Sequence, residues 1–162
     1  MIFVPLFEKD IAEPKTGTLK QRWRQFFEAL GQTYGTWYQV PHDASLYTGG
    51  GLQTWTVASA DQSTLAYVLM GQLMIVAFTI VTSSVGGVAD ASLQIAIPAG
   101  KVAARDMSAP VWVNNNGTLA IGVARVSAGG TVIAIKLVNA ANWAAAADTT
   151  GVEGQIAFEV RS

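Results

Sequence analysis

Apolar and polar residues alternate along most of the chain after residue 54. In one stretch Leu93, Ile95 and Ile97 are separated by single smaller or polar residues, and residues 155–160 repeat the pattern. A period of two places one set of side chains on each face of an extended strand, which is typical of half-buried strands. We therefore expect eight strands, near residues 54–58, 63–70, 73–82, 91–98, 110–115, 118–127, 130–139 and 154–161.

Turn-forming residues separate these predicted strands. Asn116-Gly117 lies between two apolar stretches and is a strong signal for a tight hairpin. Further turns are expected at Gly86-Gly87, Pro98-Ala99-Gly100, Gly129-Gly130 and Asp148-Thr149-Thr150-Gly151. Eight short strands at this spacing predict a mainly β fold, an eight-stranded jelly-roll-like antiparallel sandwich over residues 54–162, with a closed barrel as the alternative.

The two faces of one predicted strand carry side chains of very different size. In 118–127, Leu119, Ile121 and Val123 alternate with residues that are alanine or glycine. Small side chains let another layer approach closely. That layer can be the opposite sheet or a neighbouring subunit, and the sequence leaves both open.

Residues 18–35 predict one amphipathic helix. Thr18 and Gln21 have the spacing of a capping box, in which the two side chains satisfy free backbone donors. Gly31 and Gly35 offer places for the helix to end. An apolar stripe recurs at helical spacing through Leu19, Trp23, Phe26, Phe27, Leu30 and Tyr34.

The residues on either side of this helix predict an arm and a connector. Residues 1–17 contain Pro5 and Pro14 and have no clear period, so we expect an extended arm. Its apolar residues need burial, either on another protein or on the chain's own domain. Residues 36–53 predict a connector with a short strand near 36–40.

Charge is scarce in the β region. The whole chain has 162 residues, a formal net charge of -1 and no cysteine. Residues 49–162 carry only five basic and six acidic side chains, fewer than the surface of a small soluble domain usually has. Self-association would cover such a surface, and a neutral surface rich in Ser, Thr and Asn is the alternative.

The same charge balance argues against two classes of partner. A strong basic field for nucleic acid is absent from the sequence. The longest apolar run, 66–81, is shorter than the ~20 residues of a membrane helix, so we expect no membrane insertion.

Candidate catalytic chemistry is sparse. His42 is the only histidine, and its neighbour Asp43 does not normally face it from the adjacent position. The carboxylates of the β region fall mostly at predicted turns, where Asp commonly caps backbone groups. We expect no enzymatic activity, no metal site and no cofactor.

Tryptophans are the remaining candidates for binding. We expect Trp55 and Trp112 to be buried in the sandwich. Trp143 precedes four alanines in a loop or helical turn, so we expect an exposed aromatic side chain there that contacts a ligand.

The order of these motifs resembles that of tailed-bacteriophage virion structural proteins of the tail-fibre and head-fibre kind, which end in trimeric β-domains. The segments that carry the resemblance are 65–71, 74–80, 93–98, 115–117, 121–124 and 143–160, with Val4-Pro5-Leu6-Phe7 and Trp23-Arg24-Gln25-Phe26-Phe27 at the front. The front is similar to N-terminal arms that dock such proteins onto the particle.

The resemblance implies a homotrimer of jelly rolls and no catalytic residue. We expect a short trimeric fibre or tail appendage of the virion, assembled in the host cytoplasm and anchored to other virion proteins, with host-surface glycans or receptors as candidate ligands. The residues expected to anchor and assemble it are Phe3, Leu6, Phe7, Trp23, Phe26, Phe27 and Leu30. A capsid decoration or head-fibre protein and a carbohydrate-binding module are the alternatives.

Overall fold

The computed structural model describes residues 21, 23–25 and 35–161 of the chain. Met1–Thr36 and Trp37–Ser162 are separate compact units. The second unit contains all the described strands, and the remainder of the fold description concerns it.

The described part of the first unit is short. Residues 21 and 23–25 are helical, in agreement with the helix expected there. The predicted arm of residues 1–17 lies outside the described residues. Of the expected anchoring residues only Trp23 is described; those outside the description are Phe3, Leu6, Phe7, Phe26, Phe27 and Leu30.

All eight expected strands are present, together with two short strands inside the connector. In chain order the strands are β1 (Tyr38–Gln39), β2 (Tyr47–Gly49), β3 (Gln53–Thr56), β4 (Gln62–Met70), β5 (Leu73–Gly87), β6 (Leu93–Ala96), β7 (Met107–Asn115), β8 (Thr118–Val126), β9 (Val132–Leu137) and β10 (Ala146–Glu159). Two 3-10 turns, η1 (Ala44–Leu46) and η2 (Pro98–Gly100), complete the elements of this unit.

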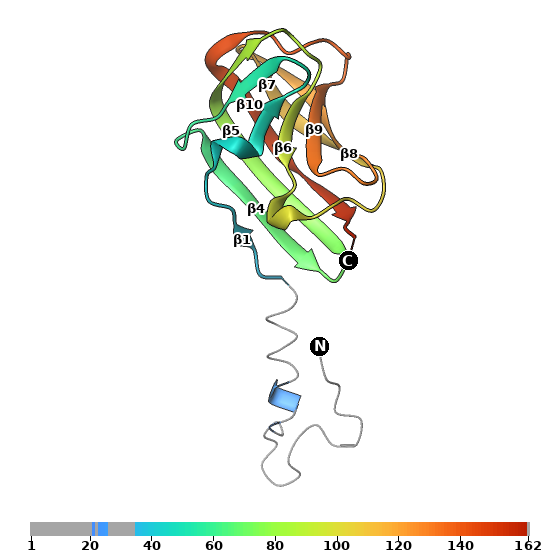
Figure 1. Ribbon diagram of the computed structural model, residues 1–162. Coiled ribbons are helices and arrows are strands. Elements are labelled where there is room, and N and C mark those ends of the chain that lie inside the picture. Colours follow the sequence, from blue (N-terminus) through green and yellow to red (C-terminus); the bar gives the residue numbers. More distant parts are fainter. Residues whose placement is uncertain (1–20, 22, 26–34, 162) are drawn as a thin grey trace. The chain divides into compact units, whose positions relative to one another are not determined.

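The strands form one antiparallel sheet that curls into a half-barrel (Figure 1). Their order is β1-β4-β5-β10-β7-β8-β9-β6-β2, and β3 pairs with β5 beyond the end of β4. The mainly β, antiparallel class expected from the sequence is confirmed. The described hydrogen bonding joins the ten strands into one sheet instead of leaving two separate sheets.

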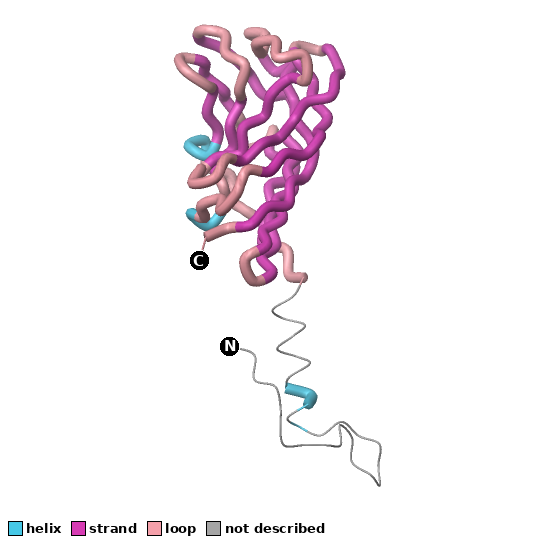
Figure 2. The backbone as a smooth tube through the Cα atoms, turned by 90° about the vertical axis from the view of Figure 1, so that its right-hand side faces the viewer, coloured by secondary structure: helices cyan, strands magenta, loops and turns pink. Residues whose placement is uncertain are grey.

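Two long strands account for this continuity. β5 has 15 residues and β10 has 14, and they pair along most of their length. Figure 2 shows the strands of the sheet from the side. β5 pairs with β4 through its first part and with β3 through its last part. A strand of that length belongs to both halves of the curl, so the ladder continues around the bend.

The turns expected at Gly86-Gly87 and at residues 148–151 are wrong, because these residues lie inside β5 and β10 respectively. Asp148 has a φ of 53°, and the β10–β5 register shifts between Ala146 and Thr150. On the partner strand Thr82 has a φ of 52°. These irregularities are β-bulges, which bend a strand without ending it. The turn-forming residues at 148–151 therefore produce a bend within a continuous strand.

The hairpin expected at Asn116-Gly117 is confirmed. The two residues have φ values of 51° and 80° and join β7 to β8, with Asn115 opposite Thr118. Positive φ at both central positions fits the twist of the flanking strands, and Asn-Gly tolerates it best. The Asn116 side chain also accepts a hydrogen bond from the Thr149 hydroxyl at 3.2 Å, which ties the hairpin to β10.

The interior of the curl is the hydrophobic core. Its largest fully buried side chains include Trp143, Phe78, Phe158, Leu65 and Met74. Trp55 is buried, as expected, and its indole N–H donates to the Ser83 hydroxyl at 2.9 Å. Ser83 in turn donates to the carbonyl of Thr150 at 2.8 Å. This chain of hydrogen bonds satisfies polar groups where the long strands bend.

Candidate functional site

Trp143 is not an exposed ligand contact, and this expectation is wrong. Its side chain is 0% exposed, and its indole N–H donates to the carbonyl of Ile135 at 3.2 Å. The run of alanines after it suggested a surface turn, but the loop folds inward and inserts the tryptophan into the core. A buried indole with its N–H paired is a packing anchor.

The Trp143 anchor fixes the whole segment between β9 and β10. The Trp143 amide donates to the carbonyl of Asp90 at 2.9 Å, and the Ala144 amide donates to the Asn115 side-chain oxygen at 2.9 Å. The Asn142 side chain donates to the carbonyl of Ala89 at 3.3 Å. Three neighbouring residues are thus held by two other parts of the fold, residues 89–90 before β6 and Asn115 at the end of β7.

Trp112 was expected to be buried, and it is instead 64% exposed. It lies on β7, where its neighbours Val111 and Val113 are buried. Alternation along the strand then sends the tryptophan to the outside. Its two strand neighbours in register are Glu153 of β10 and Ile121 of β8.

Three more large apolar side chains are exposed beside Trp112. Leu119 is 76% exposed, Ile121 is 53% exposed and Val138 is 63% exposed. Ile121 lies opposite Trp112 in the ladder, and the Val138 amide donates to the Ile121 carbonyl. We call these four residues (Trp112, Leu119, Ile121 and Val138) the outer apolar face. Contiguous apolar surface of several hundred Å² commonly marks an interaction site.

The small residues of β8 explain why this face points outward. Gly122 and Ala124 face the interior, and a Cβ at Gly122 would come within 2.7 Å of Val113. The interior has no room for the larger set, so Leu119 and Ile121 take the solvent side. The sequence allowed either the chain's own sheet or a neighbouring subunit to pack against these small residues. The atoms found next to Gly122 belong to the chain's own sheet.

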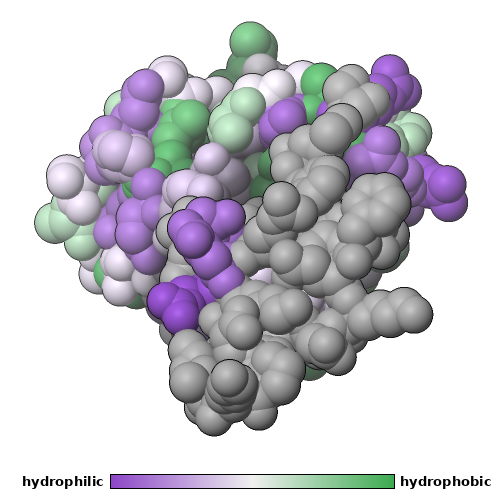
Figure 3. Space-filling model, turned by 90° about the horizontal axis from the view of Figure 1, so that it is seen from below, coloured by the Kyte–Doolittle hydropathy of each residue, from purple (hydrophilic) through white to green (hydrophobic). Residues whose placement is uncertain are grey.

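Two shallow depressions flank the outer apolar face. One of about 280 Å³ is lined by Pro110, Ile121, Val123 and Val138, among others. The other, of about 120 Å³, lies beside Trp112 and Leu119 and reaches Thr79 of β5. Seen from below, the described surface mixes apolar and hydrophilic residues (Figure 3).

A larger cleft of about 610 Å³ opens between β8 and the segment after β9. Asn115, Asn116 and Asn139 give it a polar wall, and Ile121, Leu137 and Val138 give it an apolar wall. None of its nine lining residues is charged. The cleft therefore suits a neutral occupant with both apolar and hydrogen-bonding groups.

The carboxylates that sequence reasoning considered for catalysis serve turns and strand edges. Asp61 accepts from the Ala58 amide and the Thr82 hydroxyl, and Asp148 accepts from the Ser84 hydroxyl. Glu159 pairs with Arg105 at 2.9 Å on the surface. The Asp61 and Asp148 contacts both lie at residues 82–84 of β5, whereas Glu159 lies opposite Leu73 at the other end of that strand.

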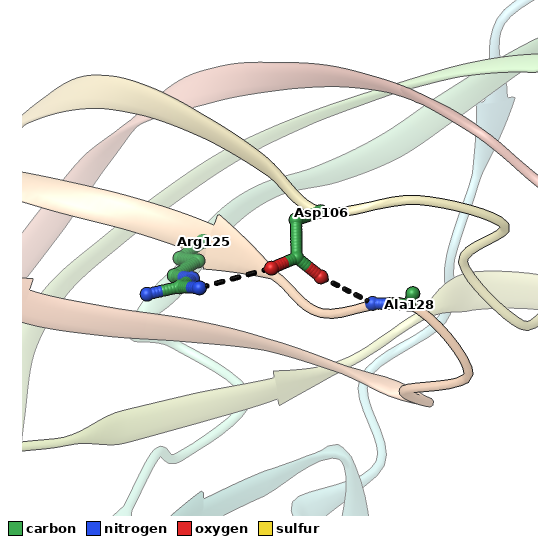
Figure 4. Close-up of polar contacts among 3 residues, drawn as sticks. All are labelled: Asp106, Arg125 and Ala128. Atoms are coloured by element: carbon green, nitrogen blue, oxygen red, sulfur yellow. Dashed lines mark hydrogen bonds and ion pairs between the residues drawn. The ribbon is translucent and has the colours of Figure 1, made fainter.

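Asp106 accepts one hydrogen bond from a backbone amide and one from an arginine side chain (Figure 4). It accepts from the Ala128 amide at 2.8 Å and from the Arg125 guanidinium at 3.0 Å. These contacts, the amide first, lower the pKa of the Asp106 carboxyl from its ordinary value. The residue ties the chain before β7 to the turn between β8 and β9.

Replacing Asp106 with asparagine should destabilise the fold in a pH-dependent way. A lowered folded-state pKa means that the stabilisation is present above the unfolded-state pKa and is lost as the pH falls through the folded-state pKa. The variant should therefore have a lower melting temperature than the wild type at pH 7. That difference should shrink between about pH 5 and about pH 3.

The matched control is Arg125→Met, which keeps the Ala128 amide bond and should have the smaller effect. A difference between wild type and Asp106→Asn that stays constant across this pH range would contradict the assignment.

His42 and Asp43 do not form a catalytic pair. The His42 Nε2 atom lies 2.8 Å from the carbonyl oxygen of Val57. Asp43 caps η1 by accepting from the Ser45 amide at 2.9 Å, and that bond lowers the pKa of its carboxyl. Tyr47, next to this turn, donates to Gln62, and burial raises the pKa of its phenol to about 12. These residues hold the connector against the sheet.

Within residues 21, 23–25 and 35–161, no three potential metal ligands gather at one place. The helical residues of the same part include no segment with the length and hydropathy to span a bilayer.

Comparison of the chain with protein families, with curated proteins and with solved structures finds no match.

Proposed function

We propose that this chain is a structural protein of a bacteriophage particle, a short trimeric fibre or tail appendage. The observation that carries the proposal is the outer apolar face, which a folded and charge-poor β-domain presents to solvent. Burying a Leu, Ile or Val side chain that was exposed contributes about 1.5–3 kcal/mol. A second copy of the chain can supply the covering surface.

The sequence of the chain supports the virion assignment through its order of parts. Residues 1–17 would anchor the protein to another virion protein, and residues 18–35 would dock or trimerise. The curled sheet would be the projecting jelly-roll-like head. Particle assembly takes place in the host cytoplasm, and the protein then resides in the virion.

The distal loops remain the proposed place for contact with a host glycan or receptor, but Trp143 no longer serves that role. Trp112 is an exposed aromatic side chain with Glu153 as its neighbour in register, and aromatic faces stack on sugar rings. A carbohydrate-binding module is therefore the second candidate. Glycan binding by a monomeric form, lost on Trp112→Ala, would favour it over assembly.

Labelling the protein on purified particles tests the virion proposal. An antibody against the β-domain should decorate particles of the phage that encodes the chain, at the tail or at its tip. Decoration distributed over the capsid shell would identify a head-fibre or decoration protein instead. Absence of the protein from purified particles would overturn the proposal.

A further inference from the structure

The 610 Å³ cleft lies where β9 would continue if it were as long as its neighbour. β9 ends at Leu137, which lies opposite Gly122 of β8. β8 itself begins four residues before Gly122, at Thr118. The chain leaves the sheet at Asn139, whose side chain accepts from the Ala141 amide, and at Ala140, whose φ is 57°. This local turn takes the chain away from the first residues of β8.

The register of β8 shows which backbone groups are left without a strand partner. The Val138 amide donates to the Ile121 carbonyl, so Ile121 directs its backbone groups toward β9. Backbone groups alternate in direction along an antiparallel strand, so Leu119 directs its N–H and C=O the same way. Pro110 of β7 lies opposite Val123 of β8. By the same alternation Val123 directs its backbone groups toward β9, so no N–H is needed from the residue opposite it on β7, and proline has none.

The described β9 no longer pairs with β8 beyond Ile121. The Leu119 N–H and C=O therefore point to the side that β9 has left, between Thr118 and Ala120 of the cleft lining, and no described strand pairs with them there. That is the pair of groups that a further antiparallel strand would use. The unpaired edge covers residues 118–120 of β8, which is roughly 10 Å of extended chain and suits a short extended segment.

The side chains of the cleft complement such a strand. The oxygens of Asn115, Asn116 and Asn139 are each occupied within the fold, by Ala144, Thr149 and Ala141 respectively. Their amide N–H groups remain to donate to carbonyl oxygens. Leu137 and Val138 offer an apolar wall, and the Trp143 anchor holds the opposite side in place.

We infer that this cleft binds an extended, uncharged polypeptide segment of a partner protein, which adds as a strand to the free edge of β8. The free N–H and C=O of Leu119 select a backbone with both a donor and an acceptor, as in strand addition generally. The neutral lining disfavours a charged segment, because burying an unpaired charge is costly. The inference rests on the backbone edge of β8. Because Leu119, Ile121 and Val138 also belong to the outer apolar face, a partner strand and a second copy of the chain would compete for this surface.

A short synthetic peptide tests the inference on the full-length protein. The probe is a blocked pentapeptide, acetyl-Thr-Val-Thr-Val-Thr-amide, added to isotope-labelled protein and followed by NMR. We expect saturable shifts centred on Leu119, Ile121 and Val138. Exchange of the Leu119 amide hydrogen should slow by at least ~5-fold, as expected when it gains a hydrogen bond.

Two controls separate strand addition from apolar adsorption. The same peptide with its central amide N-methylated keeps its side chains and loses one donor, so it should bind at least ~5-fold more weakly. Leu119→Pro removes the N–H that faces the cleft and leaves the β7 ladder intact, as Pro110 does on the partner strand. It should weaken binding of the unmodified peptide while the melting temperature shows that the domain is folded.

Two results would overturn the inference. One is the absence of saturable shifts at the cleft. The other is equal affinity for the methylated and unmethylated peptides, which would reduce the interaction to apolar contact. The mass of the protein in solution decides the self-association. Repeating the titration on the Trp112→Asp variant keeps an assembled outer apolar face from hiding the edge, and absence of shifts there too would overturn the inference.

Discussion

Trp143→Ala is expected to lower the free energy of unfolding by about 3–5 kcal/mol, the range for removal of a fully buried tryptophan. The substitution empties the largest fully buried side-chain site and removes the indole N–H that donates to the Ile135 carbonyl. Because domains are stable by only about 5–15 kcal/mol, the variant should be close to unfolding at 37 °C. Denaturant unfolding followed by circular dichroism measures the difference.

Trp112→Ala is the matched control for this experiment. It removes the same side chain from a position that is mostly exposed, so its effect on the isolated subunit should stay within about 0.5 kcal/mol. Trp143→Phe keeps an aromatic ring and loses the N–H, so it should fall between the two. If Trp143→Ala and Trp112→Ala unfolded at the same denaturant concentration, Trp143 would not be the anchor described above.

Trp112→Asp is expected to weaken self-association by at least about 30-fold, because truncating an aromatic residue at the centre of an interface commonly costs about 2 kcal/mol or more. The new carboxylate would also lie beside Glu153, its register neighbour on β10, and like charges repel. Sedimentation velocity across a range of concentrations measures the shift toward single chains.

Leu52→Asp is the control for the Trp112 variant. Leu52 is 78% exposed and lies between β2 and β3, outside the outer apolar face. It introduces the same charge at another exposed apolar position. It should leave association unchanged, and an equal loss with both variants would show that any added charge disperses the protein.

The sequence predicts the strands of this protein better than their curvature. Alternation at residues such as Leu93 and Ile95 reports a local property of the strand, and both side chains are buried as their pattern indicates. The curl depends on bulges at Thr82 and Asp148 within long strands. A bulge and a turn use the same residue types, so the sequence at 148–151 fits a strand end as well as a bend.

The candidate site was harder to predict because it depends on which face of a strand is buried. The sequence predicts that Trp112 is buried and Trp143 is exposed, and the structure shows the reverse. In β8 the decisive signal was the glycine at 122, since a residue that small indicates close approach of another layer. With that face buried, Leu119 and Ile121 must be outside. The free edge beside them depends on where β9 stops, which Asn139 and Ala140 set locally.

The most direct test of the account is the mass of the full-length protein in solution. Sedimentation equilibrium at micromolar concentrations should give three times the 17.1 kDa of one chain, and Trp112→Asp should lower that value. A mass of 17.1 kDa at every concentration, with Trp112 still open to solvent, would contradict the claim that the outer apolar face is an assembly surface.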